Sequence, residues 1–152
     1  MPGIYVTVTA PVGAPPSVVY GIIADYKRGH PAILPAKYFQ NLRVTAGGVG
    51  AGTRISFEML AMGRTTTLHA DISEPEPGRV LHEYYPAEGM LTTFTVNGRE
   101  EGRASMVTIE TRYQKGGVAG WIERLIIPGF LRTVFTAELA QLDQVARARG
   151  AQ

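Results

Sequence analysis

Apolar and polar residues alternate at the start of the chain and then take up a helical spacing. Residues 4–9 have the period of two that is typical of a β-strand, and Pro11 is expected to end it. In residues 17–26 apolar side chains recur every three or four positions, with Ser17 as the expected amino-terminal cap of a short helix. The segment HPAILP that follows, at 30–35, leaves room for no more than one further helical turn.

Between residues 39 and 113 the helical spacing disappears, and short alternating runs are separated by turn residues. This is the pattern of antiparallel strands joined by hairpins. Six strands are expected, at about 39–45, 53–59, 65–73, 80–85, 91–96 and 104–113. The residues assigned to their concave face are Ile55, Phe57, Phe94, Val107 and Ile109, and those assigned to the outer face are Arg54, Ser56 and Glu58.

The helical spacing returns after Gly116 and Gly117 and continues almost to the end of the chain. Its apolar stripe consists of Ile122, Leu125, Ile126, Phe130, Val134, Phe135, Leu139, Leu142 and Val145. This stripe predicts one long amphipathic helix. Pro128 and Gly129 lie inside it. Because a proline removes a backbone hydrogen bond and clashes with the preceding turn, a kink or a break is expected there.

The order of these elements is one strand, two short helices, six strands and one long helix. It predicts an α+β fold in which a curved, seven-stranded antiparallel sheet is wrapped on the carboxyl-terminal helix. One domain over residues 1–152 accounts for the whole chain. A single helix is too narrow to fill the concave face of such a sheet. The remaining space is expected to hold large side chains or a cavity of the kind that binds apolar ligands.

Composition and charge narrow the classes of function. The sequence has no cysteine, which excludes zinc–thiolate sites, iron–sulfur clusters, thiol nucleophiles and disulfides. Its 15 Lys and Arg against 13 Asp and Glu give a net charge of +2 without a basic patch, so nucleic acid is not an expected partner. No apolar run approaches the ~20 residues that span a bilayer, and the first ten residues lack the basic start of a secretion signal. A cytoplasmic protein without membrane insertion is expected, and a homodimer is left open.

Four segments, which together touch most of the chain, carry a resemblance to a known family. They are VTVTAPVGAPPSVVYGIIADY at 6–26 with the following HPAILP, AGGVGAGT at 46–53, EPEPGRVL at 74–81, and GWIERLIIPGFLRTVFTAELAQL at 120–142. These segments are similar to the polyketide cyclase/dehydrase-like branch of the SRPBCC superfamily, which includes START domains and the birch-pollen allergen fold. The resemblance implies a helix-grip fold with an internal hydrophobic cavity. It carries over no catalytic motif, because the superfamily includes lipid carriers, hormone receptors and cyclases.

The glycine-rich segment AGGVGAGT has a composition that can also cradle a phosphate through its backbone N–H groups. A phosphate-binding loop has Lys and then Ser or Thr after its final glycine, whereas Gly52 is followed by Thr53 and Arg54. The dinucleotide-binding spacing is also missing. The favoured interpretation is a hairpin that needs positive φ.

The histidines raise the question of a metal site. His69, Asp71 and His82 have the residue types of a two-histidine, one-carboxylate centre. If residues 75–78 form a four-residue hairpin loop, Asp71 lies opposite His82 and all three side chains point away from the cavity. We therefore expect a surface Asp–His pair, with no metal and no cofactor.

The same register places Glu83 opposite Ala70, on the cavity side of the sheet. A carboxylate on an apolar concave face must find a hydrogen-bond donor or stay protonated, and a raised pKa is how an enzyme obtains a general acid or base near neutral pH. The favoured alternative is a structural carboxylate near the rim of the sheet, hydrogen-bonded to Tyr85, Tyr113 or Arg124.

His30 is the second candidate catalytic residue, because its connector is expected to cover one end of the cavity. An imidazole there could contact a ligand or move protons. The favoured interpretation is that it caps or hydrogen-bonds nearby backbone.

These observations favour a protein that binds a small hydrophobic molecule, with Glu83, Tyr85, Thr92 and Tyr113 as orienting polar groups. The full set of expected ligand-binding residues is Ile33, Leu34, Phe57, Met59, Leu68, Glu83, Tyr85, Thr92, Phe94, Ile109, Tyr113, Ile126, Phe130 and Val134. The alternative is an aromatase, cyclase or dehydratase that uses Glu83 or His30 for acid–base chemistry in the same cavity. A third alternative, a partner-binding module, predicts a filled cavity and an exposed apolar patch.

Overall fold

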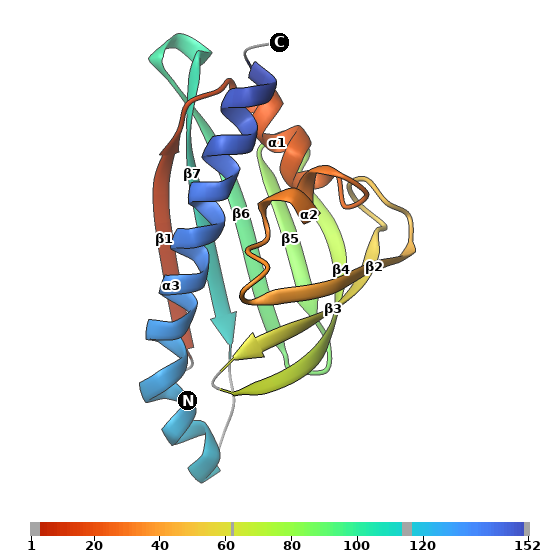
Figure 1. Ribbon diagram of the computed structural model, residues 1–152, viewed down its shortest axis with the longest axis vertical. Helices are drawn as coiled ribbons and strands as arrows, with labels where there is room; N and C mark the ends of the chain where they lie inside the picture. Colours follow the sequence, from red (N-terminus) through yellow and green to blue (C-terminus); the bar gives the residue numbers. More distant parts are fainter. Residues whose placement is uncertain (1–3, 62, 114–116, 151–152) are drawn as a thin grey trace.

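The computed structural model describes the backbone of residues 4–61, 63–113 and 117–150, and the side chains of all of these except 117–126. Over this part of the chain, a curved sheet is wrapped on one long helix (Figure 1). The strands are β1 (Ile4–Val12), β2 (Phe39–Ala46), β3 (Arg54–Ala61), β4 (Arg64–Glu76), β5 (Val80–Tyr85), β6 (Met90–Arg99) and β7 (Ala104–Tyr113). The helices are α1 (Pro16–Ala24), α2 (Gly29–Ile33), the short 3-10 helix η1 (Glu100–Gly102) and α3 (Gly117–Gly150). The predicted α+β fold is confirmed.

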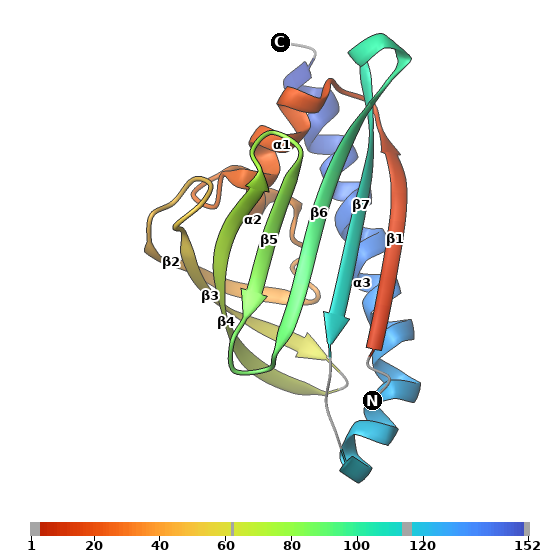
Figure 2. The same cartoon turned by 180° about the vertical axis from the view of Figure 1, so that it is seen from behind.

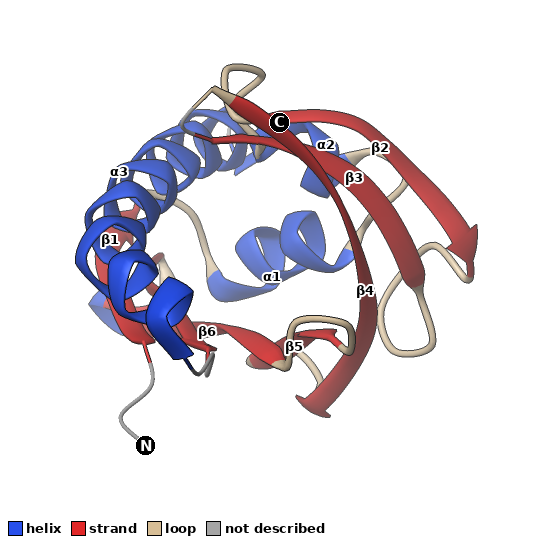
Figure 3. Cartoon of the chain, turned by 90° about the horizontal axis from the view of Figure 1, so that it is seen from below, coloured by secondary structure: helices blue, strands red, loops and turns tan. Residues whose placement is uncertain are grey.

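The seven strands form one antiparallel sheet in the order β1-β7-β6-β5-β4-β3-β2. The first strand therefore lies beside the last, and the others follow chain order (Figure 2). Seen from one end, the sheet curls so that β2 and β3 turn back toward α3, and α1 lies within the curve (Figure 3). The arrangement leaves α3 to close the concave side.

Two predicted boundaries at the start of the chain are wrong. Pro11 does not end the first strand, since β1 continues to Val12 and Pro11 lies opposite Met106. β1 is an edge strand, where a proline is tolerated because its missing N–H is not needed by a second neighbour. Ser17 is not the cap of α1, because the helix starts at Pro16, whose fixed φ suits the first helical position.

The β4–β5 hairpin differs from the predicted register by two residues. Ile72 lies opposite Glu83, Asp71 opposite Tyr84 and Ser73 opposite His82. The predicted pairs, Asp71 with His82 and Glu83 with Ala70, are wrong, because β4 extends to Glu76 with an irregularity after Ser73. A slip of two residues preserves the face on which each side chain lies, so Glu83 still points inward.

The long helix α3 runs from Gly117 to Gly150 with Pro128 inside it, so of the predicted kink or break, a break is wrong. A proline has a φ that fits a helix, and the loss of one backbone hydrogen bond is offset when the following turns are packed. Those turns are packed here. Val134, Leu139 and Leu142 are buried and lie in the hydrophobic core.

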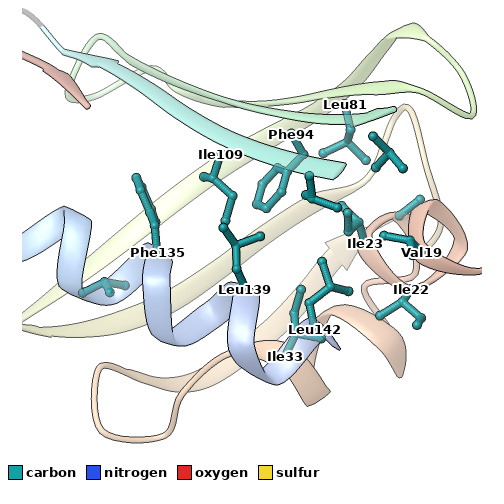
Figure 4. Packing of buried hydrophobic residues seen from close by; sticks show 14 of the residues in the cluster. Val19, Ile22, Ile23, Ile33, Leu81, Phe94, Ile109, Phe135, Leu139 and Leu142 are labelled. Atoms are coloured by element: carbon teal, nitrogen blue, oxygen red, sulfur yellow. The ribbon is translucent and has the colours of Figure 1, made fainter. Parts of the chain in front are cut away.

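The core gathers where α1, the carboxyl-terminal half of α3 and the middle of the sheet meet (Figure 4). In that view Phe135, Leu139 and Leu142 extend from α3 toward the sheet and the short helices. The predicted inward residues are all buried, and they are Ile55, Phe57, Phe94, Val107 and Ile109. Arg54 is exposed, and Ser56 and Glu58 are only half-buried, so the predicted strand faces are confirmed.

Candidate functional site

A cavity of about 750 Å³ lies between the concave face of the sheet and α3. Its lining is mostly apolar. The lining residues are His30, Leu34, Phe39, Leu42, Ile55, Phe57, Met59, Ala61, Arg64, Thr66, Leu68, Glu83, Tyr85, Glu88, Met90, Thr92, Phe94, Thr111, Tyr113, Ile127, Phe130, Leu131, Phe135 and Glu138. The core fills one end of the concavity and leaves the rest open, because the side chains of one helix do not reach across the whole sheet.

The structure brings most of the predicted ligand-binding residues to this cavity. Those in its wall are Leu34, Phe57, Met59, Leu68, Glu83, Tyr85, Thr92, Phe94, Tyr113 and Phe130. Ile33, Ile109 and Val134 are instead fully buried in the core and are not among the lining residues. Ile126 lies outside the residues whose side chains the structure describes.

Five buried residues with polar groups lie close together beside the cavity, and we call Tyr26, His30, Glu83, Tyr85 and Glu138 the inner cluster. All of them except Tyr26 line the cavity. The Tyr26 hydroxyl donates to Glu83 Oε2 at 2.5 Å, and the Tyr85 hydroxyl donates to Glu83 Oε1 at 3.0 Å. Both carboxylate oxygens of Glu83 thus accept a phenolic hydrogen bond. Burial raises the pKa of Tyr26 and of Tyr85 well above the usual tyrosine value, and the Glu83 charge raises both further.

His30 is held in one orientation by the backbone. Its Nδ1 lies 2.7 Å from the carbonyl oxygen of Ile23, and because a carbonyl only accepts, Nδ1 carries the hydrogen and donates it. The ring stacks on Tyr26 with centroids 4.3 Å apart. The predicted backbone hydrogen bond is therefore present, and it leaves Nε2 as the ring nitrogen without a backbone partner.

Glu138 brings a second carboxyl group to the same place. His30 Nε2 lies 3.5 Å from Glu83 Oε2 and 3.8 Å from Glu138 Oε1. Burial raises the pKa of Glu138 well above the usual value, and the nearby charge of Glu83 adds to this effect. Burial and the neighbouring charge thus both favour the neutral form of the Glu138 carboxyl.

The rim of the cavity is different in character. It is formed by Arg64, Thr66, Glu88 and Met90, where β4 begins and where β5 turns into β6. Arg64 and Thr66 are exposed, and Glu88 and Met90 are half-buried. The rim therefore includes exposed side chains, whereas all the side chains of the inner cluster are buried.

Tyr26, Glu138 and Glu88 are among the residues of the wall and its support that the sequence analysis does not predict as part of the site. Tyr26 was assigned only to the apolar face of a helix. Glu138 lies three residues after Phe135 and four before Leu142, so the helical spacing places its carboxyl group on the buried stripe and could have identified it. Glu88 lies in a hairpin turn, where no spacing indicates the direction of a side chain. Arg124, a predicted partner of Glu83, lies outside the described side chains.

The glycine-rich segment is a structural turn, as favoured. Gly47, Gly50 and Gly52 have φ of 67°, 69° and 88°, which few other residues adopt. Its backbone N–H groups are used within the protein: Gly50 donates to the Ala24 carbonyl, and Ala51 donates to Glu74 Oε1 at 2.7 Å. Hydrogen bonds of this kind leave no cradle for a phosphate.

The three residues considered for a metal site are placed on the outer side of the sheet. His69 and Asp71 are exposed, and Asp71 lies 3.5 Å from Arg54 rather than beside His82. Among the residues that the structure describes, no three His, Asp or Glu side chains are grouped so that they could hold a metal ion. Within the same part of the chain, no helix has the length and apolar character needed to cross a lipid bilayer.

Comparisons with known proteins agree with this geometry. Among solved structures, the chain is similar to the KanY protein (25% identity, TM-score 0.83, covering 97% of this chain and 99% of that one). It is also similar to the Zhui aromatase/cyclase from Streptomyces sp. R1128 (18% identity, TM-score 0.77, covering 97% of this chain and 96% of that one). A START superfamily protein from Mycobacterium smegmatis is similar as well (11% identity, TM-score 0.71, covering 93% of this chain and 98% of that one). No curated protein matches the sequence. A family model described as polyketide cyclase / dehydrase and lipid transport matches residues 4–147, and the chain therefore belongs to this family.

Proposed function

We propose that this protein binds a small, largely apolar molecule in the cavity between the sheet and α3. The observation that carries the proposal is the cavity itself: about 750 Å³ of space with a mostly apolar wall, inside a chain whose core is otherwise packed. Ligand pockets usually measure about 300–1,000 Å³ and combine apolar walls with a few placed polar groups. The inner cluster supplies such groups.

Native mass spectrometry of the freshly purified protein tests the proposal. The expected spectrum contains the 16.4 kDa chain together with a complex that carries one small molecule, retained from the cell or added as a mixture of apolar metabolites. The matched control is the variant Leu68→Trp with Met90→Trp, which adds two large rings to the cavity wall. Equal capture by the control, or no capture by either protein, would contradict the proposal.

A second candidate function is acid–base catalysis on the bound molecule, favoured by the two carboxyl groups that flank His30 Nε2. In a cyclase or dehydratase, Nε2 would take a proton from carbon beside a carbonyl group, and the protonated Glu138 would donate to the developing enolate oxygen. Both residues line the cavity, so a substrate reaches both.

The variant His30→Asn separates the two candidate functions. Asn retains a side-chain N–H for the Ile23 carbonyl but cannot exchange a proton near neutral pH. If the protein is an enzyme, turnover of a reactive poly-β-carbonyl compound falls by about 10²–10⁴ while the compound still binds. Turnover that is absent in the wild type leaves binding as the function, whereas turnover that is unchanged in the variant excludes His30 as the base.

A further inference from the structure

Glu88, at the rim of the cavity, has a buried oxygen without a partner. Its backbone N–H donates to the Tyr85 carbonyl at 3.2 Å, which fixes the turn between β5 and β6, and its side chain lines the cavity. Among the residues that the structure describes, its Oε1 is the one buried side-chain oxygen or nitrogen that makes no hydrogen bond. A buried carboxylate oxygen left without a donor is costly, so such an atom in a cavity wall points to a donor on the molecule that enters.

The other polar groups of the wall do not supply that donor. The Tyr85 hydroxyl donates to Glu83, and the hydroxyls of Thr92 and Thr111 lie 2.7 Å apart and bond each other. None of the described residues donates to Glu88 Oε1, and the carboxyl groups of Glu83, Glu88 and Glu138 line the same space.

The charges of the cavity wall also favour a ligand that donates a hydrogen bond over one that carries a carboxylate. Arg64 is the one Lys or Arg among the lining residues, and it is exposed to water at the rim, where an ion pair contributes little. A ligand carboxylate placed deeper would meet Glu88 and then Glu83, and like charges in an apolar space repel strongly. An ammonium group would be attracted but would first have to lose its hydration in a mostly apolar cavity, which a hydroxyl loses more readily.

Building on the proposed function, we infer that the cavity takes an elongated apolar molecule with a hydroxyl group, which donates to Glu88 Oε1, and that it discriminates against molecules whose polar end is a carboxylate. The hydroxyl thus supplies a donor to the buried oxygen of Glu88 that lacks one.

Displacement of the neutral dye Nile red tests this inference with three probes of similar length. They are 1-decanol, its isomer methyl nonyl ether, which cannot donate, and decanoate. At pH 7.5 we expect 1-decanol to bind about tenfold more tightly than the ether, although the ether is the more apolar isomer. Decanoate should bind more weakly than 1-decanol by at least the same factor.

Two variants assign the preference to Glu88. Glu88→Leu removes the acceptor and should make 1-decanol and the ether bind equally. Glu88→Gln removes the charge at constant size and should bring decanoate at least threefold closer to 1-decanol. The same two changes at Glu101, an exposed residue of the turn between β6 and β7, should alter neither ratio.

The outcomes separate this inference from the proposed function. If the ether or decanoate binds as tightly as 1-decanol, or if both Glu88 variants keep the wild-type ratios, the inference is wrong although the cavity still binds apolar molecules. Tighter binding of decylammonium than of 1-decanol would contradict the inferred hydroxyl and show that the partner of Glu88 is a cationic group. If neither the dye nor any probe binds, the proposed function itself fails and the inference falls with it.

Discussion

The two ends of the cavity differ in how the polar side chains on their apolar wall are hydrogen-bonded. In the inner cluster the side chains are buried and three of them are joined by hydrogen bonds: Glu83 accepts from Tyr26 and Tyr85. His30 donates to a backbone carbonyl. At the rim, Glu88 has an oxygen without a partner, and Arg64 is exposed to water.

This difference indicates which polar residues hold the fold and which remain available to a ligand. Replacing a buried carboxylate whose two oxygens both accept hydrogen bonds strongly destabilises the fold, because its donors lose their acceptor. An unpartnered carboxylate at a rim contributes little to the fold and gains when a donor arrives. We therefore expect changes in the inner cluster to affect stability first, and changes at the rim to affect binding first.

The largest expected effect on stability comes from the hydrophobic core next to the inner cluster. Leu139→Ala should lower the free energy of unfolding by about 2–5 kcal/mol, because Leu139 is buried and its truncation leaves a void in the core. The matched change Met90→Ala, at the half-buried rim, should cost about 1 kcal/mol or less. Urea denaturation of both variants measures the difference, and equal losses would show that the two ends are packed alike.

The next effect concerns the Glu83 hydrogen bonds. Glu83→Gln should lower the free energy of unfolding by about 1–3 kcal/mol, because a Gln side chain has one accepting oxygen and leaves either Tyr26 or Tyr85 without an acceptor. Glu88→Gln is the control at the rim and should change stability by less than about 0.5 kcal/mol. A Glu83 variant as stable as its control would contradict the structural role of the inner cluster.

The pH dependence of stability should differ between wild type and Glu138→Gln. Because the pKa of Glu138 is raised in the folded state, the folded chain holds a proton that the unfolded chain releases, and this contribution is complete below the usual pKa of 4.5 and is lost as the pH rises toward the folded value. Gln carries no such proton. The stability of the variant relative to wild type should therefore increase with pH from about 4.5 upward, as measured by denaturation between pH 4 and 8. A difference that does not change with pH would mean that Glu138 has an ordinary pKa.

The smallest effect is expected at Arg64. Arg64→Gln should change the free energy of unfolding by less than about 0.5 kcal/mol, because the side chain is exposed. Binding of a neutral apolar molecule should also be nearly unchanged. A large loss of decanoate binding alone in this variant would show that carboxylates enter with their charge at the rim.

The sequence predicts the face of each strand better than it predicts which residues meet. Alternation alone places Glu83 on the concave side, and this survives the two-residue error in register because the period of a strand is two. The irregularity after Ser73 that causes the error has no local signature. The Tyr26 hydrogen bond to Glu83 joins residues 57 positions apart, in the turn after α1 and on a strand, and no periodicity predicts such a contact.

The most direct test of the central claim, that the cavity holds an apolar molecule, is a Nile red fluorescence titration of three proteins. Wild type should bind one equivalent with a blue-shifted emission. The variant Leu68→Trp with Met90→Trp, which fills the cavity, should bind about tenfold more weakly or worse, a loss of about 1.4 kcal/mol. The control Val49→Trp with Tyr84→Trp places the same rings at sites that are 63% and 45% exposed and should bind like wild type. Equal binding by all three proteins would place the dye on the surface and contradict the account.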